Sequence, residues 1–302
     1  MEKLGIVTIT YNSEKVLDDF IESVLRQSYT NFKLFIIDNY SSDSTISILN
    51  NTQDERIRVI KNKENIGVAA ANNQGIKEAI NSECKQVLLL NNDVVFEKDL
   101  LKKLIKFQKR TKASLVAPKI MFYENPNLIW FAGSWFNKSK GFIAEHRGMD
   151  EHDNGQYDKE IEIEYAPTCC LLINKVVFED VGLMDEKYFV YFDDTDFAYR
   201  ILKHGKHKMY YFPGVRFYHK VGSLTNSRKL EKKRLIRTTF FLKQNVRNQI
   251  YFLKKSRSLY SILFIAFLFF RNNIRFIVSK RIKKDFKTFV LINRSYFEGI
   301  FM

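Results

Sequence analysis

The chain has 302 residues, with 49 lysines and arginines against 34 acidic residues and a formal net charge of +15. Its hydrophobic content of 45% and charged content of 27% are those of a globular protein, which excludes wholesale disorder. Its three cysteines, two of them adjacent, cannot form a disulfide framework, and no CxxC pair offers a zinc ribbon, so we expect a reducing compartment. The basic excess points to an acidic partner, which is nucleic acid, an anionic membrane or a phosphorylated ligand.

The basic residues are concentrated at the C-terminal end of the chain. Residues 226–302 hold 19 basic and 3 acidic side chains, a balance of +16, and residues 1–225 have a balance of −1. This shift predicts a domain boundary near residue 225, between a near-neutral body (1–225) and a basic, mainly helical C-terminal region (226–302). A nucleic-acid-binding protein would carry its basic side chains on the folded reader domain, so the charge distribution argues against a nucleic acid partner.

Strand and helix patterns alternate over the first 90 residues. Short β-branched or apolar runs predict buried strands at Gly5–Thr10, Phe32–Asp38, Ile57–Ile60 and Gln86–Leu90. Helical spacing follows the first two strands, and a helix is predicted over Val68–Ile80. The alternation indicates an α/β fold with a mostly parallel sheet, in which ligands bind at the carboxyl ends of the strands. Those ends are polar here, at residues 10–12, 38–39 and 91–93.

The polar ends lack a phosphate-binding glycine motif. Neither GxGxxG nor GxxxxGK[ST] follows the first strand, so a bound nucleotide would be held by side chains and a cation. The segment Asn91-Asn92-Asp93 offers oxygen ligands for Mg²⁺ or Mn²⁺, with the ligand's phosphates completing the coordination. Alternatively these residues cap a helix over Val94–Phe107, because Asn and Asp are preferred caps.

A second acidic segment, Asp193-Asp194-Thr195-Asp196, follows an aromatic run. Three carboxylates in four residues repel one another and tend to raise at least one pKa, which suits a general base, whereas a helix cap needs only one acid. His219 is a candidate metal ligand, although a lone histidine is more often a surface or core residue. Trp130 and Trp135 suit either a sugar-binding surface or core packing.

In their order along the chain, these segments resemble family 2 glycosyltransferases, specifically the bacterial rhamnosyltransferase-like branch. The matching segments are residues 7–13 (VTITYNS), 36–45 (IIDNYSSDST), 65–75 (NIGVAAANNQG), 90–93 (LNND), 181–186 (VGLMDE), 193–196 with Arg200, and 219–223 (HKVGS). The resemblance covers about residues 5–225. It implies the GT-A fold, a Rossmann-like, mostly parallel sheet flanked by helices.

The resemblance also implies a role for individual residues. The donor nucleotide would be bound by Thr10, Asn12, Asp38, Asn73 and Asn92. Asp93 and His219 would hold Mn²⁺ or Mg²⁺. Asp194 would be the catalytic base, with Asp193 as the alternative.

The implied reaction is an inverting, metal-dependent sugar transfer in cell-surface polysaccharide synthesis. The donor would be a dTDP- or UDP-linked sugar, with rhamnose favoured, and the acceptor a saccharide or a polyprenyl-linked saccharide. A sugar nucleotidyltransferase is the alternative enzyme, but it would need a glycine-rich basic loop after the first strand. A nucleic-acid-binding protein is the non-enzymatic alternative.

The C-terminal region contains the most apolar run, Leu259–Phe270. Twelve helical residues span roughly 18 Å, short of the roughly 30 Å hydrocarbon core, so we expect no transmembrane helix. Basic flanks instead predict an interfacial helix on an anionic membrane surface, with a packing subdomain or a homo-oligomer interface as the alternative. Because Met1–Val7 lead directly into a strand, no secretory signal is expected, and the predicted location is cytoplasmic, on the inner face of the cell membrane.

Overall fold

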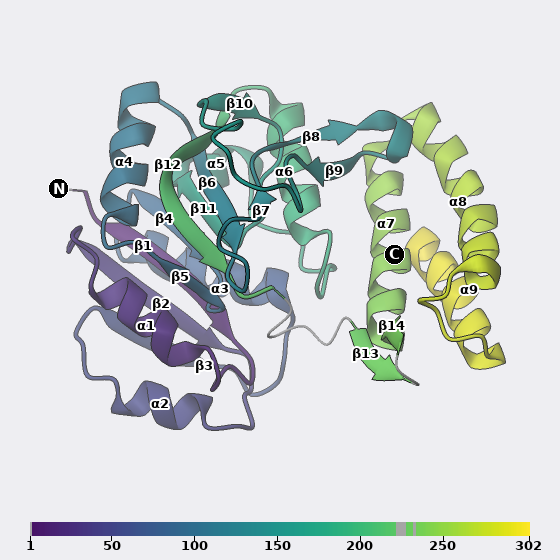
Figure 1. The fold of residues 1–302 in the computed structure, drawn as a ribbon, viewed down its shortest axis with the longest axis horizontal. Helices are drawn as coiled ribbons and strands as arrows, with labels where there is room; N and C mark the ends of the chain where they lie inside the picture. The colour runs from purple at the N-terminus through teal and green to yellow at the C-terminus, as the bar shows by residue number, and fades with distance from the viewer. Residues whose placement is uncertain (1, 222–227, 232–233) are drawn as a thin grey trace.

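The computed structural model describes residues 2–221, 228–231 and 234–302. The boundary near residue 225, and Gly222 and Ser223 of the last matching segment, lie outside the described residues. A sheet with helices on its faces forms one side of the molecule, and three C-terminal helices form a bundle beside it (Figure 1).

The first 90 residues form the parallel half of the central sheet, as the sequence predicts. Four parallel strands lie in the order β3-β2-β1-β4. Their bounds are Leu4–Thr10 (β1), Phe32–Asp38 (β2), Ile57–Lys61 (β3) and Gln86–Leu90 (β4). The connecting helices are Leu17–Leu25 (α1), Thr45–Asn51 (α2) and Val68–Asn81 (α3). The carboxyl ends of β1, β2 and β4 therefore meet at one edge of the sheet.

Two glycines allow α3 to lie directly on β1. A Cβ atom at Gly5 would be 2.5 Å from the Cβ of Ala79, and one at Gly75 would be 2.2 Å from a methyl group of Val7. Both distances are shorter than any real contact, so larger side chains here would push the helix away from the sheet.

Beyond β4 the sheet becomes mixed. Strand β11 (Cys170–Asn174) is antiparallel to β4 and to β6 (Leu115–Phe122), and β12 (Met209–His219) is parallel to β6. Shorter strands pair at its margin: β5 (Val94–Phe96), β7 (Ile129–Phe131) and β10 (Ile161–Ile163). Helices α4 (Leu100–Thr111), α5 (Lys175–Val181) and α6 (Asp193–His204) belong to this half. A separate hairpin joins β8 (Ser134–Asn137) to β9 (Ile143–His146) through a short 3₁₀ turn.

The segment after Asp93 is a strand, so its interpretation as a helix cap is wrong. Val94–Phe96 pairs antiparallel with β12, with Val94 opposite His219, and α4 begins only at Leu100. The sequence pattern missed this because an apolar triplet satisfies either period equally well. The pairing has a functional consequence, since it brings Asp93 beside His219.

The C-terminal region consists of the hairpin β13 (Arg228–Glu231) and β14 (Arg234–Arg237), followed by α7 (Thr239–Ser256), α8 (Leu259–Val278) and α9 (Phe286–Phe301). The three helices contact one another and share a small apolar cluster with Phe142 and Tyr188 of the body. Gly141, at the tip of the β8–β9 hairpin, lies against the ring of Phe264 in α8.

Helix α8 is longer than the apolar run in the sequence. Its 20 residues span roughly 30 Å, so the length argument against a membrane-spanning helix does not hold. Among the described residues it is the one helix that is long and apolar enough to cross a bilayer, and only 22% of its most apolar stretch is buried.

Candidate active site

A cavity of about 700 Å³ lies where the sequence predicts a site, at the carboxyl ends of β1, β2 and β4. Strand ends contribute Tyr11, Asn39 and the segment Asn91–Asp93. The other walls come from α3 and the loop before it (Asn65, Gly67, Val68, Asn72), β7 (Trp130), the segment before β11 (Thr168), the loop before α6 (Phe189, Val190, Tyr191), the end of β12 and the residues after it (His219, Val221), and the start of α7 (Thr238, Thr239, Phe240). The cavity lining therefore contains several amide side chains and several aromatic side chains.

Asp93 and His219 form a buried pair at this cavity. His219 Nε2 lies 3.2 Å from Asp93 Oδ1, and the backbone N–H of Lys220 donates to the carbonyl oxygen of Asp93. The two residues lie 126 positions apart in the numbering, and the β5–β12 pairing brings them together. The Trp130 ring contacts the His219 imidazole edge-on, with ring centroids 4.7 Å apart.

A second histidine lies on Trp130 but is held neutral. The His146 and Trp130 ring centroids are 4.7 Å apart, and His146 Nδ1 lies 3.2 Å from the carbonyl oxygen of Trp130. Burial lowers the pKa of His146 to about 4. The two histidines that contact Trp130 come from different strands, His146 from β9 and His219 from β12.

The residues around Asp93 suit a divalent cation. His219 Nδ1 and Asn92 Oδ1 are buried without a hydrogen-bond partner, and both atom types ligate cations. Within the described ranges, no group of three or more histidine, cysteine or acidic residues is placed to hold a metal. A cation at this site would therefore depend on further oxygen ligands from a bound diphosphate and water.

Asp194 and Asp193 begin α6. The Tyr165 hydroxyl donates to Asp194 Oδ2 at 2.7 Å, and the backbone N–H of Thr195 donates to Asp194 Oδ1 at 2.6 Å. Burial raises the pKa of both carboxyl groups, and the negative charge of Asp194 raises that of Asp193 further. Asp193 is 4% exposed, whereas Asp194 is only half-buried and thus more accessible to a substrate.

Cys169, which directly precedes β11, is buried. Its buried thiol has a raised pKa, chiefly because of burial, and the charges of Asp93 and Asp194 both contribute. Neither Asp193 nor Asp194 is among the residues that line the cavity. The thiol is protonated and inert at neutral pH, as expected of a buried structural cysteine.

The other residues that the sequence predicts to bind the donor nucleotide form hydrogen bonds within the protein. Asp38 is 2% exposed and accepts from Thr10 Oγ1 at 2.8 Å and from the backbone N–H of Ser41 at 3.0 Å. Asn12 Oδ1 accepts from the backbone N–H of Ser42 at 2.8 Å, which ties the end of β1 to the loop after β2.

Asn73 and Asn92 differ in their position. Asn73 Nδ2 donates to the carbonyl oxygen of Met184 at 2.9 Å and fastens α3 to the segment before α6. Asn92 lines the cavity and donates to the carbonyl oxygen of Ile9 at 3.0 Å. Of the predicted site residues, Asn92, Asp93 and His219 line the cavity, whereas Thr10, Asn12, Asp38 and Asn73 are not among its lining residues.

Sequence reasoning missed the contribution of α7. Asn248, which is fully buried, donates through Nδ2 to the carbonyl oxygens of Val190 and Tyr191, each at 2.9 Å. Tyr191 and the next residue, Phe192, have positive φ angles of 67° and 68°, a strained conformation for non-glycine residues. Helix α7 therefore helps to hold the loop that leads into Asp193. The available sequence signal was the group of amide residues within α7: Gln244, Asn245, Asn248 and Gln249.

The fold and the cavity define the class of protein, which is the GT-A class of α/β proteins. The chain is similar to S. aureus TarS residues 1–349 in complex with UDP, with a TM-score of 0.58 and 15% identity, over 93% of this chain and 73% of that one. The chain belongs to glycosyl transferase family 2, whose family model matches residues 5–182.

Curated relatives agree with this family. The hexosyltransferase Agl10 of low-salt glycan biosynthesis in Haloferax volcanii is 24% identical over 66% of this chain and 62% of its own length. The UDP-Glc:alpha-D-GlcNAc-diphosphoundecaprenol beta-1,3-glucosyltransferase WfaP of Escherichia coli is 25% identical over 66% of this chain and 68% of its own. The dTDP-rhamnosyl transferase RfbF of Shigella flexneri is 24% identical over 72% of this chain and 68% of its own length. Some relatives are matched over less than two thirds of their length, with 62% of Agl10 covered and 41% of another relative.

Proposed function

We propose that this protein transfers a sugar from a nucleoside diphosphate donor to a saccharide or lipid-linked acceptor during glycan biosynthesis. The observation that carries the proposal is the cavity in which Asn92, Asp93 and His219 converge. A series of contacts runs from Asp194 through Tyr165 and His146 to Trp130 on the cavity wall. Membership of glycosyl transferase family 2 supports the same reaction class.

In the proposed reaction Asp194 removes the proton from the acceptor hydroxyl. Its raised pKa makes it a stronger base than a solvated aspartate, and the Tyr165 hydroxyl and the Thr195 N–H fix its orientation. The acceptor oxygen attacks C1 of the donor sugar as the bond from C1 to the diphosphate oxygen breaks. One base and no protein nucleophile give a single displacement with inversion at C1.

Asp93 and His219 would hold Mn²⁺ or Mg²⁺ together with the donor diphosphate. When bound, the cation would neutralise the charge that develops on the leaving diphosphate. The chain's own contribution is to present one carboxylate, one imidazole and the orphaned Asn92 amide oxygen at the same wall. The Trp130 ring supports the imidazole from one side.

The donor sugar is the finer part of the proposal. We favour dTDP-rhamnose, which the name of the Shigella relative supports, with UDP-hexoses as the alternative suggested by the E. coli relative. The latter name also supports a polyprenyl diphosphate-linked acceptor. Such an acceptor resides in a membrane, which agrees with a location on its cytoplasmic face and with the exposed apolar side chains of α8.

A donor-hydrolysis screen tests the proposal. The full-length protein is incubated with Mn²⁺ and either dTDP-rhamnose, UDP-glucose or UDP-N-acetylglucosamine, and released dTDP or UDP is quantified. We expect one donor to be hydrolysed at least about tenfold faster than the others, because a sugar pocket that bonds specific hydroxyls rejects analogues lacking them. If no sugar nucleotide is bound or hydrolysed, transferase function is wrong. The Asp194→Asn variant controls for contaminating hydrolases.

A further inference from the structure

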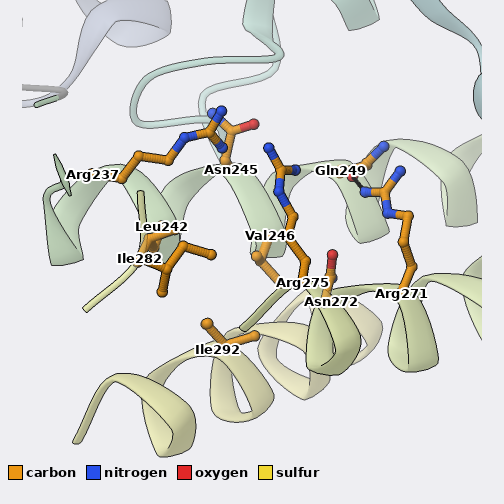
Figure 2. Close-up of a pocket in the computed structure, with 10 residues that line it drawn as sticks. All are labelled: Arg237, Leu242, Asn245, Val246, Gln249, Arg271, Asn272, Arg275, Ile282 and Ile292. Atoms are coloured by element: carbon orange, nitrogen blue, oxygen red, sulfur yellow. Dashed lines mark hydrogen bonds between the residues drawn. The ribbon is translucent and has the colours of Figure 1, made fainter. Parts of the chain in front are cut away.

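A pocket lined by three arginines lies within the C-terminal helical region and shares no lining residue with the candidate active site (Figure 2). We call it the arginine pocket, made of Arg237, Arg271 and Arg275 with the amides of Asn245 and Gln249. Figure 2 shows the three guanidinium groups extending to the same side of α7, with apolar side chains beneath them: Leu242, Val246, Ile282 and Ile292. None of the ten lining residues is acidic.

The pocket contains buried hydrogen-bond donors that the described residues leave unsatisfied. Arg271 Nη2 donates to Gln249 Oε1 at 3.1 Å. Arg271 Nε and Gln249 Nε2, however, are buried and have no acceptor. Buried donors nearly always have a partner, so two orphaned donors in one pocket indicate a missing acceptor.

The charges in the pocket identify that acceptor as an anion. Burial and the positive charge of Arg275 lower the pKa of Arg271, so the two guanidinium groups destabilise each other. An anion between them would relieve the repulsion and accept several hydrogen bonds at once. Phosphate oxygens match the planar arrangement of guanidinium donors particularly well.

The outer face of α8 indicates that the phosphate group belongs to a lipid. Apolar side chains of this helix are more than half exposed at Leu259, Ile262, Leu263, Phe267, Phe270, Ile274, Ile277 and Val278. Arg275 is the one charged residue among the exposed positions of α8, all of which the structure describes. A continuous apolar surface beside cationic side chains matches the acyl chains and the headgroup of an anionic lipid.

We propose that the arginine pocket binds the phosphate group of an anionic membrane lipid whose acyl chains contact the outer face of α8. The site recognises phosphate in addition to collecting negative charge, because the donors Arg271 Nε and Gln249 Nε2 are buried and the Arg271–Gln249 hydrogen bond orients them. This inference goes beyond the proposed sugar transfer and does not depend on it.

The test compares two double variants of the full chain that lose the same charge. Arg271→Gln/Arg275→Gln removes two donors of the pocket, and Lys280→Gln/Lys287→Gln removes two exposed cations of the same region. Each protein is mixed with phosphatidylcholine vesicles containing phosphatidic acid, or containing cholesteryl hemisuccinate, a carboxylate lipid, at matched surface charge. Partitioning is measured by co-sedimentation, and inorganic pyrophosphate without vesicles is the third ligand.

The wild-type protein is expected to prefer phosphatidate vesicles over carboxylate vesicles at least about tenfold, because guanidinium–phosphate hydrogen bonds add to the general attraction of cations. The pocket variant should lose this preference, and the lysine variant should keep it while binding both vesicles more weakly. Equal preference in the two variants would show that only distributed charge matters. Binding of pyrophosphate without any vesicle preference would make a soluble phosphate the ligand and overturn the lipid.

Two controls keep the outcome interpretable. Circular dichroism and donor hydrolysis should be unchanged in the pocket variant, since its substitutions lie outside the candidate active site. If the double variant fails to fold, Arg275→Gln alone, at an exposed position, should reduce the phosphate preference by several-fold. An unchanged preference in that single variant would contradict the proposal.

Discussion

Lys255 of α7 and Asp196 of α6 form an ion pair, with the ammonium nitrogen 2.7 Å from Asp196 Oδ1. Arg200 contacts the other carboxylate oxygen at 2.8 Å, and Lys255 also lies 2.7 Å from Asp185. The third acid of the 193–196 segment is therefore neutralised by cations, which leaves Asp193 and Asp194 as the pair with raised pKa values. Part of the positive charge of residues 226–302 therefore forms ion pairs with carboxylates of residues 1–225.

Replacing Lys255 with methionine should destabilise the protein and slow donor hydrolysis. Asp196 is almost fully buried, and removing one partner of a buried pair costs about 3–5 kcal/mol, less here because Lys255 is partly exposed and Arg200 remains. We expect a loss of about 1–3 kcal/mol in urea denaturation. The matched control is Lys254→Met, whose ammonium group bonds the Ile300 carbonyl at the surface. Equal losses in both variants would contradict a special role for Lys255.

Asp194→Asn should abolish sugar transfer while leaving donor binding intact. The amide keeps the shape of the carboxylate but cannot accept a proton, and loss of a general base lowers rates by about 10²–10⁴-fold. Turnover and donor affinity are measured separately, by product release and by calorimetry. Asp193→Asn, at the adjacent buried position, is the comparison. If that variant loses turnover and Asp194→Asn retains it, the base is Asp193.

Asp193→Asn should stabilise the protein at neutral pH, and by more as the pH rises. The folded state holds the Asp193 proton at pH values where the unfolded state, with a pKa of about 3.9, has already lost it. The free energy of unfolding of the wild type therefore falls as the pH rises above about 4, until Asp193 ionises in the folded state too. Asparagine removes this loss.

Urea denaturation between about pH 4.5 and 8 measures this difference, with Asp18→Asn at an exposed position of α1 as the control. If the free energies of unfolding of the Asp193 variant and the wild type differ by the same amount at every pH, the raised pKa of Asp193 is disproved.

Asp93→Asn and His219→Phe should each weaken Mn²⁺ binding in the presence of UDP by at least about tenfold, because each removes one of few protein ligands. Electron paramagnetic resonance of free Mn²⁺ reports this binding without an activity assay. EDTA should also abolish transfer, and Mn²⁺ or Mg²⁺ should restore it.

The structure offers a matched control in a second Asp–His pair, Asp180 and His207, which has a separation of 2.9 Å and does not line the cavity. Asp180→Asn should leave Mn²⁺ binding unchanged. Transfer that persists in EDTA would eliminate the metal role.

Serine substitutions on the outer face of α8 should reduce membrane binding without reducing stability. Ile262 and Phe270 are exposed, so Ile262→Ser/Phe270→Ser removes no buried contact, but it removes apolar area that would enter a membrane interface. Flotation with anionic vesicles should fall at least about tenfold. Leu202→Ser/Met149→Ser, at exposed apolar positions of the body, should float like the wild type. Equal flotation of both variants would favour an interface between protein chains.

The parallel half of the fold could be predicted from the sequence because each element there has a single clear period. Four apolar runs end in polar residues, and the structure places three of those ends around one cavity. The segment at Val94–Phe96 could not be predicted, since three apolar residues fit a strand or a helix, and only pairing with β12 decides between them. The same pairing decides that His219 meets Asp93.

The structure has a cavity at the strand ends where the sequence predicts a site, but the hydrogen-bond partners of the predicted residues could not be predicted. Sequence order alone could not indicate that Asp38 is enclosed by Thr10 and Ser41, or that Asn73 bonds Met184. It also could not show that Asn248 of α7 holds the loop before Asp193. These contacts join residues distant in the chain, so no local pattern encodes them.

The sequence by itself determined the class of fold, the family resemblance and the concentration of positive charge in residues 226–302, because composition, period and motif order are properties of the chain alone. The tertiary structure decided how that charge is used. Lys255 neutralises buried carboxylates, and Arg271 and Arg275 face a pocket, because helix packing determines which charges acquire partners and which remain available to a ligand.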